Sequence, residues 1–107
     1  MRIRNLTPHV INIHGTSEGE VAVLHPDGVV PRVSSTKELI GMLEGIPIYR
    51  QTVGEIVDLP AEEEGVFLVV SLPVRLAVPH RGDVASPGDL LRDAEGRPVG
   101  CLGLHIN

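Results

Sequence analysis

Hydrophobic and polar positions alternate with a period of two over much of the chain, which is the pattern of β-strands. In the segment HVINIH, residues 9–14, His9, Ile11 and Ile13 fall on one face of the predicted strand. The segments EVAVL, 20–24, and VVPRVS, 29–34, flank the turn sequence HPDG and predict a hairpin.

Further strands are predicted in the second half of the chain. The segments IPIYRQT, 46–52, and GEIVDL, 54–59, indicate two strands around Gly54. The run VFLVVS, 66–71, is apolar up to its last residue, which is typical of a central strand covered on both faces. The segment 90–106 predicts two strands joined by a turn near Ala94 to Gly96.

The segment SSTKELIGMLEG, 34–45, is a candidate helix. Ser35 and Glu38 have the spacing of a capping box, and Gly45 is a typical stop signal. Gly41 opposes this helix by about 1 kcal/mol. The pattern favours a helix over residues 36–44 but leaves its formation open.

A second short helix is predicted directly after the apolar run. The segment LPVRLAVP, 72–79, reads either as a bent strand or as a helix begun by Ser71, with Pro73 in its first turn. The helix is favoured because Leu72 and Leu76 would then share a face and Pro79 would end it.

These elements predict the fold class. A chain of 107 residues with one Phe, one Tyr and no Trp must build its core from aliphatic side chains. We expect a single domain over residues 1–107, of the α+β class and mostly β: a small, partly closed β-sheet or barrel with one or two short helices. Exposed strand edges and aliphatic surface favour a homo-oligomer.

Composition and charge narrow the partners. Fourteen acidic residues against nine basic ones disfavour binding to a nucleic-acid polymer, although a small nucleotide needs only one or two arginines. The single cysteine, Cys101, cannot form an internal disulfide. No apolar run has the length of a signal peptide or a membrane span, so a cytoplasmic protein without membrane contact is expected.

Catalytic and metal-binding motifs are not found in the sequence. His9 and His14 point to opposite faces of one strand, and no His-Glu-x-x-His or Cys-x-x-Cys spacing occurs. The Gly-x-Ser-x-Gly and phosphate-binding glycine motifs are also missing. We therefore expect no metal, no cofactor and no catalytic residue, which favours a binding protein over an enzyme.

The stretch PHRGDVASPGD, residues 79–89, is the first candidate binding site. Arg81 has the planar fork that grips a phosphate or carboxylate, Asp83 can orient that fork, and His80 can donate a proton. The alternative is a plain loop in which Arg81 and Asp83 pair only with each other.

Two other places carry candidate ligand-binding residues. In NLTPH, residues 5–9, Pro8 stiffens the backbone between Thr7 and His9, while Asn5 and Thr7 are equally suited to capping a turn. Ser71 ends the apolar strand, where it is either part of a site or the N-cap of the following helix.

Together, the segments NLTPHVINI, GVVPRVSS, GIPIYRQTVGEIVDLP, GVFLVVSLPVRLAVPHRGDVASPGD and LLRDAEGRPVGCLGL resemble a group of small phage and prophage proteins. The resemblance covers nearly the whole chain and implies a phage origin, without a settled activity. The positions that carry it are Asn5, Thr7, Pro8, His9, Arg32, Ser71, Arg81, Asp83, Pro87, Gly88, Asp93, Gly96 and Arg97.

Three functions follow as expectations. The first is a non-catalytic protein that binds a small anionic molecule, such as a nucleotide signal, through Arg81 and Asp83 with His80 or His9 nearby. The second is an interaction protein that inhibits a host enzyme, which requires an exposed aliphatic patch. The third is a small hydrolase or lyase that uses His80 or His9 as its acid or base.

Overall fold

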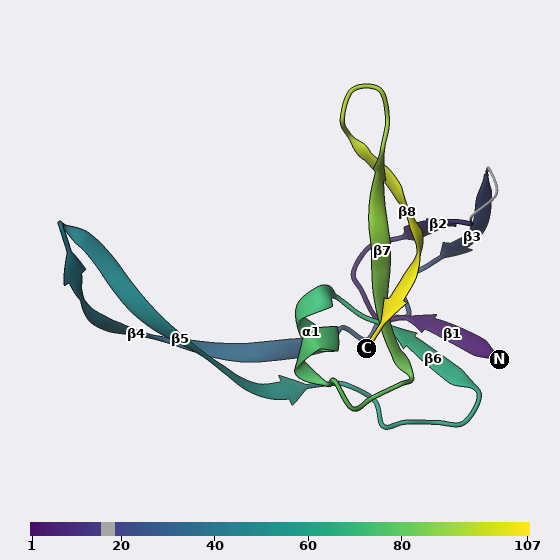
Figure 1. Cartoon of the computed structure of the whole chain (residues 1–107). Coiled ribbons are helices and arrows are strands. Elements are labelled where there is room, and N and C mark those ends of the chain that lie inside the picture. The colour runs from purple at the N-terminus through teal and green to yellow at the C-terminus, as the bar shows by residue number, and fades with distance from the viewer. Residues whose placement is uncertain (16–18) are drawn as a thin grey trace.

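The computed structural model describes residues 1–15 and 19–107, and most of them lie in β-strands (Figure 1). Six strands form one sheet, in the order β1-β6-β7-β8-β2-β3, and two more form a separate ribbon, β4-β5. The sheet strands are β1 Arg2–Asn5, β2 Ile11–His14, β3 Glu20–Leu24, β6 Val66–Val69, β7 Val84–Arg92 and β8 Pro98–Ile106. With the short helix α1, Leu72–Ala77, this confirms the predicted mostly-β fold.

The six-stranded sheet nearly closes on itself, as predicted. Its two edges are β1 and β3, and Pro26, just after β3, forms a parallel bridge with Asn5 at the end of β1. The Asp27 amide donates to the Asn5 carbonyl at 2.8 Å. The Arg4 side chain adds two hydrogen bonds to the Asp27 carboxylate, at 2.9 and 3.1 Å. A few polar contacts therefore join the two edges.

The core is divided between the two faces of β6, the predicted central strand, which lies parallel to both β1 and β7. Alternate residues of a strand point to opposite faces, so Leu68 and Val69 enter different clusters. The first cluster comprises Leu6, Val66, Leu68, Val70, Val74, Val78 and Val84. The second comprises Ile11, Ile13, Val69 and Cys101.

The helix predicted after Ser71 is confirmed. Ser71 occupies the N-cap position in an extended conformation, but its side chain makes no capping hydrogen bond. Val74 is the buried residue of α1 and packs into the first core cluster. Leu72 and Leu76 are 50% and 58% exposed, so the face they share points outward.

The helix predicted over residues 36–44 is wrong. This segment belongs to β4, Arg32–Leu43, which pairs antiparallel with β5, Ile46–Val57. Glu44 and Gly45 join the strands as a two-residue turn, and both have positive φ, 50° and 81°, as a type I′ hairpin turn requires. Because β5 is continuous, the two strands predicted around Gly54 are also a single strand.

The hairpin predicted between residues 20–24 and 29–34 is also wrong. β3 pairs with β2, and the segment that follows β3 closes the sheet instead of turning back. The candidate site 79–89 is only partly a loop. Residues 79–83 precede β7, and residues 84–89 belong to that strand.

The ribbon β4–β5, residues 32–57, is called the arm below. It projects from the six-stranded sheet (Figure 1). At its base, Val33 and Ile56 lie opposite each other and pack against the first core cluster. The arm is thus anchored at one end only.

Candidate functional site

The NLTPH segment forms a hydrogen-bonded brace inside the molecule. Asn5 and Thr7 are 2% and 7% exposed. The Asn5 amide donates to the carbonyls of His9 and Leu24, at 2.8 and 3.0 Å. Its oxygen accepts from the Thr7 amide at 3.0 Å and the Thr7 hydroxyl at 2.7 Å. Asn5 therefore directs its polar atoms inward and ties the end of β1 to the ends of neighbouring segments.

Arg81 and Asp83 form a bidentate ion pair. Arg81 Nε donates to Asp83 Oδ1 and Arg81 Nη2 to Oδ2, both at 2.8 Å. The same Nη2 donates to the Pro60 carbonyl at 3.1 Å, which ties this turn to the segment after β5. The side chains are only 16% and 9% exposed, and the hydrogen bonds from Arg81 lower the pKa of Asp83. The fork is occupied within the chain, as in the plain-loop alternative.

The remaining predicted residues are exposed and are not gathered around these two clusters. His80 and Ser71 lie on the surface, on either side of α1. His9 contributes its backbone carbonyl to the NLTPH brace and is also one of the residues that line a groove beside β8. Among the described residues, no hydrogen bond joins the Asn5–Thr7 cluster to the Arg81–Asp83 pair.

Within residues 1–15 and 19–107, no three His, Cys, Asp or Glu side chains gather in a way that could hold a metal ion. Cys101 is buried in the second core cluster.

No helix in the described part of the chain has the length and apolar character needed to span a membrane.

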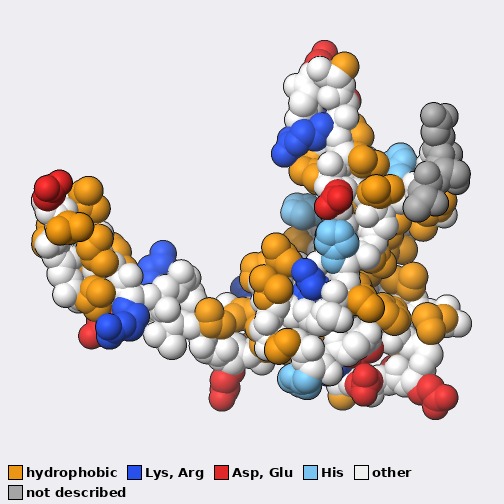
Figure 2. Space-filling model, viewed as in Figure 1, with side chains coloured by type: hydrophobic (Ala, Val, Ile, Leu, Met, Phe, Trp, Pro, Cys, Tyr) orange, Lys and Arg blue, Asp and Glu red, His pale blue; other side chains and the backbone are white. Residues whose placement is uncertain are grey.

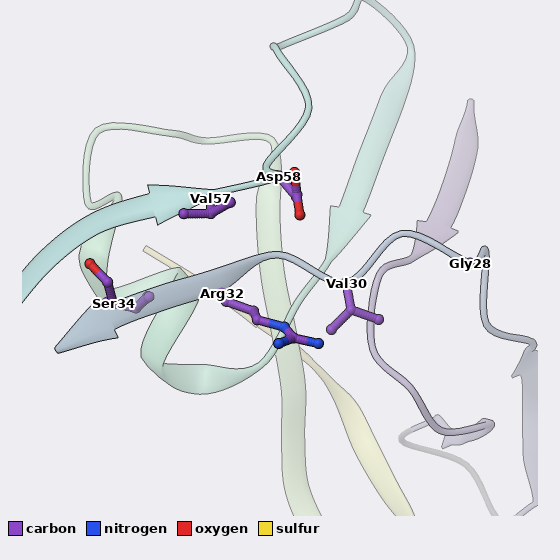
Figure 3. Close-up of a pocket in the computed structure, with 7 residues that line it drawn as sticks. Gly28, Val30, Arg32, Ser34, Val57 and Asp58 are labelled. Carbon is purple, nitrogen blue, oxygen red and sulfur yellow. The ribbon is translucent and has the colours of Figure 1, made fainter.

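A hollow of about 590 Å³ lies at the base of the arm (Figure 3). It is lined by Gly28, Val30, Arg32, Val33, Ser34, Val57 and Asp58. Arg32 extends along the hollow toward Val30, and Asp58 lies across from it, directly after the end of β5 (Figure 3). In the described residues the Arg32 guanidinium makes no side-chain hydrogen bond or ion pair, which leaves its fork free for an anionic group. In the sequence, Arg32 stands out only through the resemblance.

The arm carries a feature that the sequence interpretation missed. At its far end, residues 39–49, apolar side chains face solvent, as the space-filling view shows (Figure 2). The exposed fractions run from 38% for Ile48 to 65% for Leu43. These residues, called the arm tip below, are Leu39, Ile40, Met42, Leu43, Ile46, Ile48 and Tyr49. The sequence signal was present: two apolar runs flank Glu44-Gly45 as a hairpin requires.

The described residues thus form two internally satisfied polar clusters, a hollow with a free arginine, and an apolar arm tip. Comparison of the chain with protein-family models, with curated proteins and with solved structures finds no match.

Proposed function

We propose that the protein is a non-catalytic binding module that contacts another protein through its arm tip. The observation that carries this proposal is the apolar surface at the end of the arm. Large exposed apolar patches are uncommon on monomers and mark interaction sites, and Met and Tyr are enriched in such interfaces.

The architecture of the arm supports the proposal. The arm is a two-stranded ribbon, and isolated hairpins are marginally stable in water. Only the base is held by the core, through Val33 and Ile56. A partner that covers the tip would supply the missing burial, at about 25 cal/mol for each Å² of apolar surface removed from water.

The polar residues singled out in the sequence favour this function over ligand binding at Arg81. The Arg81 fork already holds Asp83, and Asn5 and Thr7 hydrogen-bond each other. An incoming anion would have to displace an ion pair that is largely shielded from water. The resemblance to small phage proteins makes a host protein one class of partner for the arm.

A photo-crosslinking experiment tests this function in the cell that makes the protein. A benzophenone amino acid is placed at Leu43, which is 65% exposed on the arm tip, and in a separate variant at Val21, 64% exposed on β3. We expect discrete crosslinked products from position 43 and none from position 21. Absence of products at position 43, or equal products at both positions, would contradict the proposal.

A second candidate function rests on the hollow beside Arg32. A free guanidinium facing a carboxylate across a hollow suits a small anionic molecule with a hydrogen-bond donor at its other end, such as a nucleotide. This keeps the ligand class expected from the sequence but moves the gripping residue from Arg81 to Arg32.

Thermal shift with mono-, di- and cyclic nucleotides tests this second candidate. At 100 times the dissociation constant a ligand adds about 2.7 kcal/mol to the stability of the folded state. We expect the rise in Tm to disappear in Arg32→Ala and to persist in Arg50→Ala, which removes another exposed arginine of the arm. A rise retained in Arg32→Ala, or none in the wild type, would remove this candidate.

A further inference from the structure

The chain is more extended than its length requires. Its radius of gyration is 16.9 Å, whereas a compact domain of 107 residues has one of about 13 Å. Its accessible surface is 7380 Å², whereas a compact monomer of 11.5 kDa exposes about 5,800 Å². The excess of about 1,600 Å² is close to the area that one chain contributes to a large homodimer interface.

The pairing register shows that the arm tip is apolar on both faces. On one face the cross-strand pair Leu43–Ile46 is followed by Gly41–Ile48, and on the other Met42–Pro47 is followed by Leu39–Tyr49. A flat partner surface would cover only one of these faces. The tip therefore fits a groove or an intertwined partner, which covers both.

A second apolar surface lies on the same chain, in a groove of about 500 Å³ formed by β2 and the β7–β8 hairpin. Its lining includes Val10, Ile11, Pro87, Leu90, Pro98 and Val99. Leu90 and Val99 are 53% and 45% exposed. The arm of the same chain projects away from this hairpin (Figure 1), so a tip that fills the groove has to come from another molecule.

We propose that the partner of the arm is a second copy of this chain, and that two copies exchange arms so that each tip lies in the groove of the other. This inference rests on the proposed protein-binding function and names its partner. The exchange is reciprocal, so a twofold axis closes the assembly at two chains. If each chain buries its excess surface, the pair buries about 3,200 Å², within the range of obligate homodimers.

The length of the arm agrees with this arrangement. The ten residues of β4 beyond Val33 extend about 34 Å, roughly the diameter of a small domain, so the tip can cross a second body.

Light scattering coupled to size exclusion tests the assembly directly. We expect the wild type at about 10 µM to have twice the 11.5 kDa mass of one chain. The double variant Leu43→Glu/Ile46→Glu and the groove variant Leu90→Glu should both be monomers. Val21→Glu and Leu76→Glu place the same charge on exposed residues elsewhere and should remain dimers. A wild type that is monomeric at about 100 µM, or an arm variant that stays dimeric, would overturn the inference.

A disulfide trap identifies the contact even if a glutamate variant fails to fold. Leu43→Cys and Val99→Cys, each combined with Cys101→Ala because Cys101 also lines the groove, are purified separately, mixed and oxidised. We expect a disulfide-linked dimer that forms in the mixture and not with either variant alone. A linked dimer of Leu43→Cys alone would show that arms pair with each other and would overturn docking in the groove.

The outcomes separate this inference from the proposed function. If the wild type is monomeric and position 43 crosslinks to a heavier protein in the cell, the arm exchange is contradicted and the protein-binding function is supported. If the wild type is monomeric and position 43 gives no crosslinks, both are contradicted.

Discussion

At the scale of single residues, the conspicuous polar side chains brace loops against the sheet. Asn5 joins the end of β1 to the carbonyls of His9 and Leu24, and Arg81 joins its own turn to the carbonyl of Pro60. A buried amide or guanidinium that satisfies several carbonyls is costly to replace, because each abandoned group stays out of water. Polar side chains that suggest a ligand site can thus be required simply to form hydrogen bonds with backbone groups.

The Arg81–Asp83 pair should make stability depend on pH. The pKa of Asp83 is lowered in the folded state by the Arg81 hydrogen bonds, so the pair stabilises the fold above about pH 4, the usual value for an unfolded aspartate. This stabilisation is lost as the pH falls through the lowered folded pKa. Arg81→Ala should reduce the free energy of unfolding at pH 7 by about 1.5–3 kcal/mol.

Urea denaturation of wild type and Arg81→Ala at pH 7 and at pH 3 measures this effect, and the difference between the two proteins should shrink at the lower pH. Arg97→Ala is the control, because Arg97 is 72% exposed in its contact with Asp93 and should cost under about 1 kcal/mol. An equal difference at both pH values would contradict the role of the Asp83 carboxylate.

The sequence identified these residues but not their relation to one another. Pairing between Arg81 and Asp83 was one of two open alternatives, because residues two apart in a turn can face either each other or a ligand. The Pro60 carbonyl that settles the position of the Arg81 fork lies 21 residues away along the chain. Such a contact depends on how the end of β5 returns to the sheet, which no local pattern encodes.

At the scale of elements, the local sequence pattern predicts the conformation of a segment correctly where tertiary packing favours the same conformation. The unbroken apolar run in residues 66–70 correctly predicts a central strand, since Leu68 and Val69 enter core clusters on opposite faces of the sheet. The arm shows the opposite case. Its apolar residues face solvent on both faces, so neither a period of two nor one of 3.6 identifies a buried side. The Ser35–Glu38 spacing is a local helix signal that the pairing with β5 overrides. The conformation of residues 32–43 is decided by their pairing with β5, which a local sequence pattern does not show.

The close approach of β8 to Gly88 in β7 predicts that no larger residue fits at this position. A Cβ added at Gly88 would overlap the Leu102 carbonyl oxygen and lie 2.8 Å from that of Gly103. Both obstacles are backbone, which cannot rotate away. Gly88→Ala should therefore lower the free energy of unfolding by about 1–3 kcal/mol through overpacking.

Gly82→Ala is the matched control, because nothing lies within 4 Å of its added Cβ and it lies outside the arm. It should change stability by no more than about 0.5 kcal/mol in chemical denaturation. If the two substitutions cost the same, the close approach of β7 to β8 is not what requires Gly88.

At the scale of the whole molecule, the sheet and the arm have unequal support. The sheet is nearly closed, with β6 between two parallel neighbours and core on both of its faces. The arm is attached to that core only near Val33 and Ile56. Amide exchange protection reflects how much burial holds a hydrogen bond closed, so the two parts should exchange at very different rates in a monomer.

Hydrogen exchange in the wild type and in the groove variant Leu90→Glu therefore tests both the fold and the arm exchange. Amides of β6 should exchange slowly and at the same rate in both proteins, because their protection comes from within the chain. Amides of residues 39–49 should be protected in the wild type, where a second copy covers them, and should exchange fast in the variant, which keeps the tip but loses the surface that covers it. Equal protection of the tip in both proteins would mean that the arm is held by its own chain. Protection of β7 and β8 near Leu90 and Val99 that is lost in the arm variant Leu43→Glu/Ile46→Glu would place the covered tip in the groove.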